Sequence, residues 1–144
     1  MMNNYFIILA SGQSKRFNSS KPKQFIKYKN KALFEHSLDK ALKSKLFKKI
    51  IIVTNDKKQI KKKYSKDVLI IKGGKERSDS SLIGLKFIKK YKPNNVLIHD
   101  AARPNFTIKL LKNLINSLKK IKPPSQLFPL KIQLNIKLKI NCLI

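Results

Sequence analysis

The residues of this sequence that could do chemistry lie in three short stretches, each of which directly follows an apolar run. The stretches are ASGQSKRF at 10–17, GGKERSDSS at 73–81 and HDAARP at 99–104. Small residues such as Gly12 and Gly74 let backbone N–H groups approach phosphate oxygens, and arginine and lysine add fixed positive charge. Taken singly, the first two stretches are also typical of an ordinary turn and of a capped helix start. No GxxxxGK[ST] motif is present, so the first stretch is not a P-loop.

Asp100 is a second chemical signal, because the chain has 34 basic residues and only 7 acidic ones. It follows the apolar run at 96–98 and precedes Ala101, Ala102 and Arg103. A carboxylate in this position suits a divalent cation that bridges phosphates, with the arginine meeting the same anion. The alternative, that Asp100 pairs with Arg103 or caps the next turn, stays open. His99 is predicted to be a partly buried, hydrogen-bonded histidine without a catalytic role.

Four short apolar runs predict buried strands, and three longer segments show helical periodicity. The strands are predicted at 5–10, 49–54, 68–71 and 96–99. The helices are predicted at 32–47, 80–91 and 107–120, and Asn55-Asp56 is predicted to cap a further short helix. The expected apolar faces of the three helices are Phe34, Leu38, Ala41 and Leu42; Leu82, Ile83, Leu85, Phe87, Ile88 and Tyr91; and Ile108, Leu111, Ile115 and Leu118.

This alternation of strand and helix predicts a largely parallel sheet, covered by helices on both faces and joined by right-handed crossovers. The carboxyl ends of parallel strands meet at one edge of the sheet, which is where ligands bind in open α/β folds. The three chemical stretches are therefore expected to lie together. Residues 1–144 are predicted to form a single domain, and the alternating segment Leu130–Ile140 predicts a further, half-buried strand.

Composition limits the classes of function. No apolar run reaches the roughly 18 residues that span a bilayer and no signal peptide is recognisable, so we expect a cytoplasmic protein. Cys142 and the two histidines give no zinc pattern. The formal net charge of +27 first suggests a nucleic-acid binder. However, the lysines are spread along a chain that is also rich in isoleucine and asparagine, which is the composition that codon drift in an A/T-rich genome would produce. Nucleic acid is therefore not the expected partner. A functional surface that binds polyanions stays an alternative.

Together, the stretches ASGQSKRF with PKQF, GGKERSDS and VLIHDAARP resemble the 2-C-methyl-D-erythritol 4-phosphate cytidylyltransferase family, over residues 5–118. The resemblance implies a Rossmann-like three-layer α/β/α nucleotidyltransferase fold with a mostly parallel sheet. It also implies a homodimer that uses CTP as cosubstrate and Mg²⁺ as cofactor. The implied reaction transfers a cytidylyl group to 2-C-methyl-D-erythritol 4-phosphate and releases pyrophosphate, in the non-mevalonate isoprenoid pathway.

The resemblance also assigns roles to individual residues. Arg16 and Lys23 would be the catalytic cations that neutralise charge on the α-phosphate during attack by the acceptor. Asp100 would hold Mg²⁺. The residues implied in nucleotide binding are Ala10, Ser11, Gly12, Gly74, Ser80, Ala101 and Arg103.

Some positions depart from the family pattern. Ser14 stands where a second glycine is usual, Lys75 where many members carry an acidic residue, and Leu134-Asn135 where an Asp-Thr pair is expected. We therefore expect a C-terminally truncated fold with 123–144 as a divergent tail, and turnover by this chain is left open. The alternatives are a cytidylyltransferase for another polyol phosphate, such as ribitol phosphate, and a catalytically dead, basic nucleic-acid-binding protein.

Overall fold

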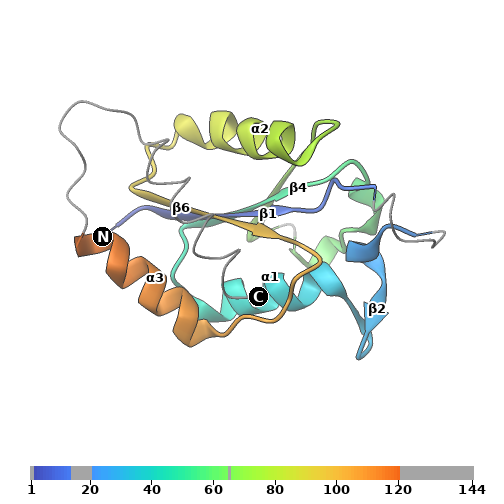
Figure 1. The fold of residues 1–144 in the computed structure, drawn as a ribbon, viewed down its shortest axis with the longest axis horizontal. Coiled ribbons are helices and arrows are strands. Elements are labelled where there is room, and N and C mark those ends of the chain that lie inside the picture. Colours follow the sequence, from blue (N-terminus) through green and yellow to red (C-terminus); the bar gives the residue numbers. More distant parts are fainter. Residues whose placement is uncertain (1, 14–20, 65, 121–144) are drawn as a thin grey trace.

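A four-stranded parallel sheet forms the centre of the molecule (Figure 1). The structure is a computed structural model that describes residues 2–13, 21–64 and 66–120. The strands are β1 (Asn4–Leu9), β4 (Lys49–Val53), β5 (Val68–Ile71) and β6 (Asn95–Asp100), in the order β5-β4-β1-β6. Every neighbouring pair in this sheet is parallel. The four strands predicted from the sequence are therefore confirmed.

Helices cover both faces of the sheet. Helix α2 (Arg77–Lys89) lies on one face, and α1 (Leu33–Ser44) and α3 (Ile108–Lys120) lie on the other (Figure 1). The shorter elements are the hairpin strands β2 (Lys27–Tyr28) and β3 (Lys31–Ala32) and the 3₁₀ helices η1 (Lys23–Phe25), η2 (Lys57–Gln59) and η3 (Lys62–Tyr64). The three-layer, Rossmann-like α/β/α architecture predicted from the sequence is confirmed.

The central strands are hydrophobic on both faces, as a sheet covered on both sides requires. In β1, Phe6 and Ile8 belong to the core under α1 and α3, whereas Tyr5 and Ile7 belong to the core under α2. Every residue of β1 is buried, so this strand forms the middle of both cores. The faces predicted for α1 and α3 are confirmed, with Phe34, Leu38, Ala41, Leu111, Ile115 and Leu118 buried and Leu42 and Ile108 half-buried.

Helix α2 contacts the sheet through smaller residues than its apolar pattern predicts. Its buried residues are Ser80, Gly84 and Ile88. Leu82 is 44% exposed, and Ile83 and Tyr91 are each 37% exposed. The predicted face is therefore wrong for these three residues, while Ile88 is buried as predicted and Leu85 and Phe87 are half-buried.

Gly84 explains why the helix presents this face to the sheet. A Cβ atom at this position would lie 3.1 Å from Cδ1 and 3.2 Å from Cγ2 of Ile7, and 3.4 Å from Cγ2 of Val53. The absence of a side chain thus lets the helix backbone approach the sheet closely. That approach directs the larger neighbours Leu82 and Ile83 toward solvent.

A cluster of charged side chains ties the small elements to α1. Glu35 is buried and forms an ion pair with Lys61, at 2.8 Å between Oε1 and Nζ. Asp39, one helical turn further on, pairs with Lys31 of the hairpin. The Tyr64 hydroxyl lies 3.2 Å from Oε1 of Glu35 and 3.1 Å from Oδ1 of Asp39. The cluster thereby fixes the hairpin and η3 against the same helix.

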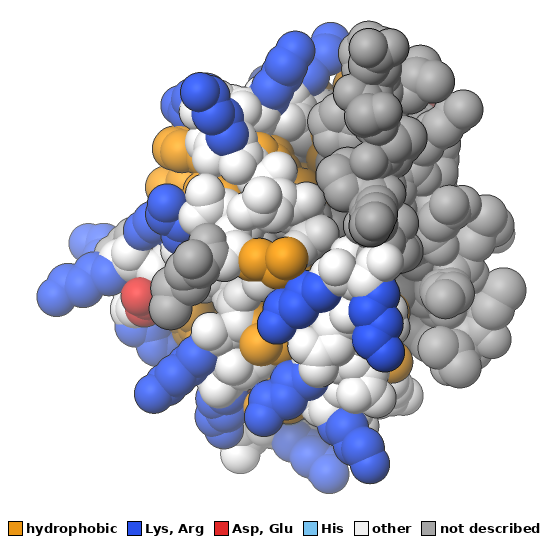
Figure 2. Space-filling view, turned by 90° about the vertical axis from the view of Figure 1, so that its left-hand side faces the viewer, with side chains coloured by type: hydrophobic (Ala, Val, Ile, Leu, Met, Phe, Trp, Pro, Cys, Tyr) orange, Lys and Arg blue, Asp and Glu red, His pale blue; other side chains and the backbone are white. Residues whose placement is uncertain are grey.

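Positive charge is spread over the face that Figure 2 shows. Figure 2 shows lysine and arginine side chains distributed over the whole described part of one face, rather than gathered in a single patch. This distribution fits the even spread of lysines along the sequence.

The predicted strand at Leu130–Ile140, like the whole divergent tail, lies outside the described residues. Among the helices that are described, none combines the length and the apolar character needed to cross a bilayer.

We predict that Gly84→Val destabilises the protein by about 1–3 kcal/mol, because the new side chain overpacks the contact with Ile7 and Val53. The measurement is the free energy of unfolding from urea denaturation. Lys86→Val is the matched control, since it introduces the same residue at an exposed position of the same helix. Equal losses in the two variants would contradict the close contact at Gly84.

Candidate active site

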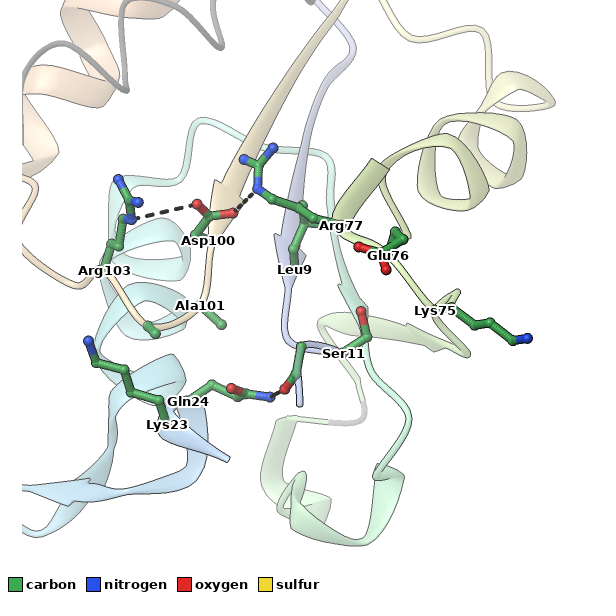
Figure 3. Close-up of a pocket in the computed structure, with 12 residues that line it drawn as sticks. Leu9, Ser11, Lys23, Gln24, Lys75, Glu76, Arg77, Asp100, Ala101 and Arg103 are labelled. Carbon is green, nitrogen blue, oxygen red and sulfur yellow. Dashed lines mark hydrogen bonds and ion pairs between the residues drawn. The ribbon is translucent and has the colours of Figure 1, made fainter. Parts of the chain in front are cut away.

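The three chemical stretches meet around one cavity at the carboxyl ends of β1 and β6 (Figure 3). The sheet order reverses direction at β1, since β4 lies on one side of it and β6 on the other. Such a switch point is the usual ligand position in open α/β sheets. The cavity has a volume of about 300 Å³ and is lined by Leu9, Ser11, Gly12, Lys23, Gln24, Lys75, Glu76, Arg77, Asp100, Ala101, Ala102 and Arg103.

Gln24 sets the shape of the first loop. Its side-chain amide Nε2 donates to the carbonyl oxygen of Ala10 at 2.9 Å and to that of Gly12 at 2.8 Å. The Gln24 side chain is buried, so these bonds exchange little with water. Gln24 belongs to the PKQF stretch, but no role was predicted for it from the sequence. A role could have been predicted, because the side-chain amide of a glutamine has two N–H donors, and this glutamine directly follows the proposed catalytic lysine.

Ser80 joins the first loop to the second. The Oγ atoms of Ser11 and Ser80 are 2.6 Å apart, and Oγ of Ser80 also accepts from the backbone N–H of Gly74 at 3.1 Å. Ser80 is completely buried. Its side chain therefore holds the two loops together from behind the cavity.

Asn55 supports the second loop in a way that the sequence did not predict. Its Oδ1 accepts from the backbone N–H of Gly73 at 3.1 Å. Asp56 stands at the start of η2 but makes no side-chain capping bond, and its own N–H donates to Oγ1 of Thr54. The predicted cap is therefore wrong, because the Asn55 side chain is directed to the neighbouring loop instead.

Asp100 lies between two arginines (Figure 3). Its Oδ1 accepts from Nε of Arg77 at 2.7 Å, and its Oδ2 is 3.6 Å from Nε of Arg103. The pairing with Arg103, left open from the sequence, is present in the structure. Arg77 was not predicted as a site residue from the sequence, because it begins α2, and only the fold brings it next to the third chemical stretch.

His99 anchors the start of the third loop in the core. Its Nε2 is hydrogen-bonded to Oγ of Ser37 at 3.2 Å, and its ring packs against Phe6 and Phe106 with centroid distances of 5.9 and 4.7 Å. Burial lowers the pKa of His99 to about 4, against the smaller raising effect of the Asp100 charge. The ring is therefore neutral near pH 7, and the expected buried, hydrogen-bonded histidine is confirmed.

The structure brings most of the predicted site residues together. Those that line the cavity are Ser11, Gly12, Lys23, Asp100, Ala101 and Arg103. Ala10, Gly74 and Ser80 are not among the lining residues, and the contacts above place Ala10 and Ser80 in the support of the loops. Arg16 lies outside the described residues. The lining side chains carry four cations against the carboxylates of Glu76 and Asp100, which suits a polyanionic ligand.

The fold and the site define a class of protein: a Rossmann-like α/β protein with a cation-rich cavity at the switch point of its sheet, as in proteins that bind nucleotides. The model of the 2-C-methyl-D-erythritol 4-phosphate cytidylyltransferase family matches residues 5–135. The chain belongs to this family.

Relatives support this membership over part of their length. A bifunctional enzyme IspD/IspF of Pelagibacter ubique is 53% identical over 120 residues, which are 82% of this chain and 32% of that protein. The 2-C-methyl-D-erythritol 4-phosphate cytidylyltransferase of Thermotoga neapolitana is 40% identical over 105 residues, which are 70% of this chain and 47% of that protein. The chain thus spans about half or less of these two relatives.

Solved structures agree with the fold. The bifunctional IspDF of Campylobacter jejuni superimposes with a TM-score of 0.71 at 28% identity, over 88% of this chain and 35% of that one. The 4-diphosphocytidyl-2C-methyl-D-erythritol synthase of Anaerococcus prevotii gives a TM-score of 0.68 at 27% identity, over 84% and 53%.

We predict that Gln24→Glu destabilises the protein by about 1–3 kcal/mol at neutral pH, because a carboxylate oxygen would replace the amide that donates to two carbonyls. Urea unfolding measures the loss. Gln59→Glu, at an exposed position of η2, makes the same chemical change without buried partners. A Gln24→Glu variant as stable as this control would show that the two bonds do not shape the loop.

We also predict that the His99 ring titrates only near pH 4 in the folded protein. Because an unfolded histidine titrates near 6.5, its neutral burial contributes stability that is fully present above pH 6.5 and is lost as pH falls toward 4. Proton NMR of the ring follows this directly, and His36→Gln assigns the signal because the chain has only two histidines. A His99 signal that shifts with a midpoint near 6.5 would contradict the burial argument.

Proposed function

We propose that this chain transfers a cytidylyl group from CTP to 2-C-methyl-D-erythritol 4-phosphate and releases pyrophosphate. The observation that carries the proposal is the meeting of Lys23, Asp100 and Arg103 around one cavity at the switch point of the sheet. Family membership supports this choice of reaction, because the similar protein of Thermotoga neapolitana is a 2-C-methyl-D-erythritol 4-phosphate cytidylyltransferase.

In the proposed reaction, a phosphate oxygen of the acceptor attacks the α-phosphorus of CTP. The bond from that phosphorus to the oxygen bridging to the β-phosphate breaks, and pyrophosphate leaves with the electron pair. Catalysis of such a transfer depends on positioning and on fixed cations near the charged oxygens. Lys23, which lines the cavity, is proposed for this role. Arg16, the second cation implied by the resemblance, stays a prediction.

The proposed nucleotide lies along the first loop and reaches the third. Ser11 and Gly12 line the cavity and would offer backbone groups to the triphosphate. Apart from its chain neighbours, no described residue has an atom within 4 Å of the position that a Cβ of Gly12 would take. Arg103 faces the same space and would pair with phosphate oxygens. Gly74 and Ser80, implied by the resemblance in cytosine recognition, keep that role as a prediction.

Mg²⁺ is the proposed cofactor, with Asp100 as its ligand. Mg²⁺ usually keeps several waters and binds through one or two carboxylates plus substrate phosphates. The single carboxylate of Asp100, beside space for a triphosphate, meets that requirement. When bound, Mg²⁺ would neutralise and orient the phosphates. The described part of the chain contains no group of three or more His, Cys, Asp or Glu that could hold a metal by itself.

Three further properties stay predictions. The homodimer is implied by the family resemblance, and the cytoplasmic location is implied by the sequence. Nucleic acid is not proposed as a partner.

The proposal predicts that the chain binds CTP in the presence of Mg²⁺ and that Asp100→Asn removes the Mg²⁺-dependent part of this affinity. Lys23→Ala should lower the rate of pyrophosphate release on the order of 100-fold while changing CTP affinity less, since its charge is needed most in the transition state. Calorimetry measures binding, and labelled CTP measures release.

Lys57→Ala is the matched control for Lys23→Ala, because Lys57 is exposed and does not line the cavity. Ribitol phosphate is the control acceptor. A chain that does not bind CTP would contradict the proposal. Faster pyrophosphate release with ribitol phosphate than with 2-C-methyl-D-erythritol 4-phosphate would reassign the acceptor.

A further inference from the structure

The cavity contains one short contact that the proposed transfer does not use, the ion pair between Arg77 and Asp100. We propose that Arg77 is a built-in counter-cation of Asp100, whose charge and hydrogen bond weaken the binding of a divalent cation to the carboxylate. Arg77 is then a positioning residue that lowers the metal affinity of the chain in the absence of nucleotide. The inference deepens the proposed function and rests on it for the role of Asp100.

The geometry distinguishes Arg77 from the other cations of the site. Its Nε donates to Oδ1 of Asp100 at 2.7 Å, the distance of a charge-assisted hydrogen bond. Nε of Arg103 is 3.6 Å from Oδ2, too far for such a bond. Of these two arginines, Arg77 is therefore the one that is hydrogen-bonded to the carboxylate.

A metal ion on either oxygen of the Asp100 carboxylate would lie close to Arg77, which is hydrogen-bonded to Oδ1. A divalent cation such as Mg²⁺ sits about 2 Å from a carboxylate oxygen, so it would lie within a few ångströms of the guanidinium and be repelled by it. The side chain of Asp100 is 23% exposed and that of Arg77 is 39% exposed, so water screens part of this repulsion. We accordingly expect a change of several-fold in metal affinity rather than of many orders of magnitude.

Lys75 offers a control that distinguishes the effect of the Arg77–Asp100 contact from the effect of the positive charge of the site. It precedes Arg77 by two residues and lines the same cavity, but its side chain points away from Asp100 (Figure 3). Replacing Lys75 by glutamine removes one positive charge, as Arg77→Gln does, without touching the carboxylate.

The test is a Mn²⁺ titration of the nucleotide-free chain, followed by water-proton relaxation. Arg77→Gln is expected to bind Mn²⁺ at least threefold more tightly than the parent chain. Lys75→Gln should gain clearly less, because it removes only a remote charge. The double variant Arg77→Gln/Asp100→Asn should lose the gain, because the carboxylate that becomes available is absent. Arg77→Met repeats the test in case the glutamine variant folds poorly, and circular dichroism confirms the fold of each variant.

Three results would overturn the proposal: no gain in Arg77→Gln or Arg77→Met, an equal gain in Lys75→Gln, or a gain that persists in the double variant. The titration uses no nucleotide. Failure of the chain to bind CTP would therefore contradict the proposed function while leaving the comparison between Arg77 and Lys75 valid.

Discussion

The candidate site depends on the register of four parallel strands. Leu9 lies level with Val53 on one side and with Asp100 on the other, and Val53 lies level with Ile71. The residue after each of three strands continues this pairing by one backbone hydrogen bond. Ala10 N–H donates to the carbonyl of Val53, Thr54 N–H to that of Ile71, and Ala101 N–H to that of Leu9, at 2.8–2.9 Å. Because all four strands end at one level and point the same way, their loops start side by side. A shift of one residue in any pair would separate the loops and turn buried side chains to the opposite face.

Three of the chain's seven carboxylates act as internal counterions. These are Glu35, Asp39 and Asp100, each of which forms an ion pair in the described part of the structure. With a formal net charge of +27, repulsion among cations opposes a compact state, so each carboxylate placed between basic groups offsets part of it. The site follows the same rule, since Asp100 lets two arginines approach one small cavity. The cavity is therefore positively charged through cations that Asp100 holds in fixed positions, and not only through the excess of basic residues in the chain.

The sequence was sufficient for the order and direction of the elements, because apolar runs and helical periods report burial directly. It was insufficient for the orientation of α2, since the positions of its large apolar residues do not show that the helix backbone packs closely on the sheet at Gly84. Pattern alone also missed Gln24 and Arg77. Their partners lie 12 to 23 residues away in the chain, and both contacts exist only after the loops have been brought together. The lining positions Lys23, Asp100 and Arg103 were predictable because each follows a strand end or belongs to a family stretch.

The bond between Ser11 and Ser80 bears on how a ligand would be received. Since one buried hydroxyl bonds to Ser11 and also accepts from Gly74, the chain at these two positions is placed by folding and not by the arriving molecule. Immobilising a long lining side chain such as Lys23, Lys75 or Arg103 would still cost about 0.5–1.5 kcal/mol for each one. Preorganisation at Ser11 and Gly74 favours discrimination by shape, because a backbone held in this way cannot adjust to a ligand of a different outline.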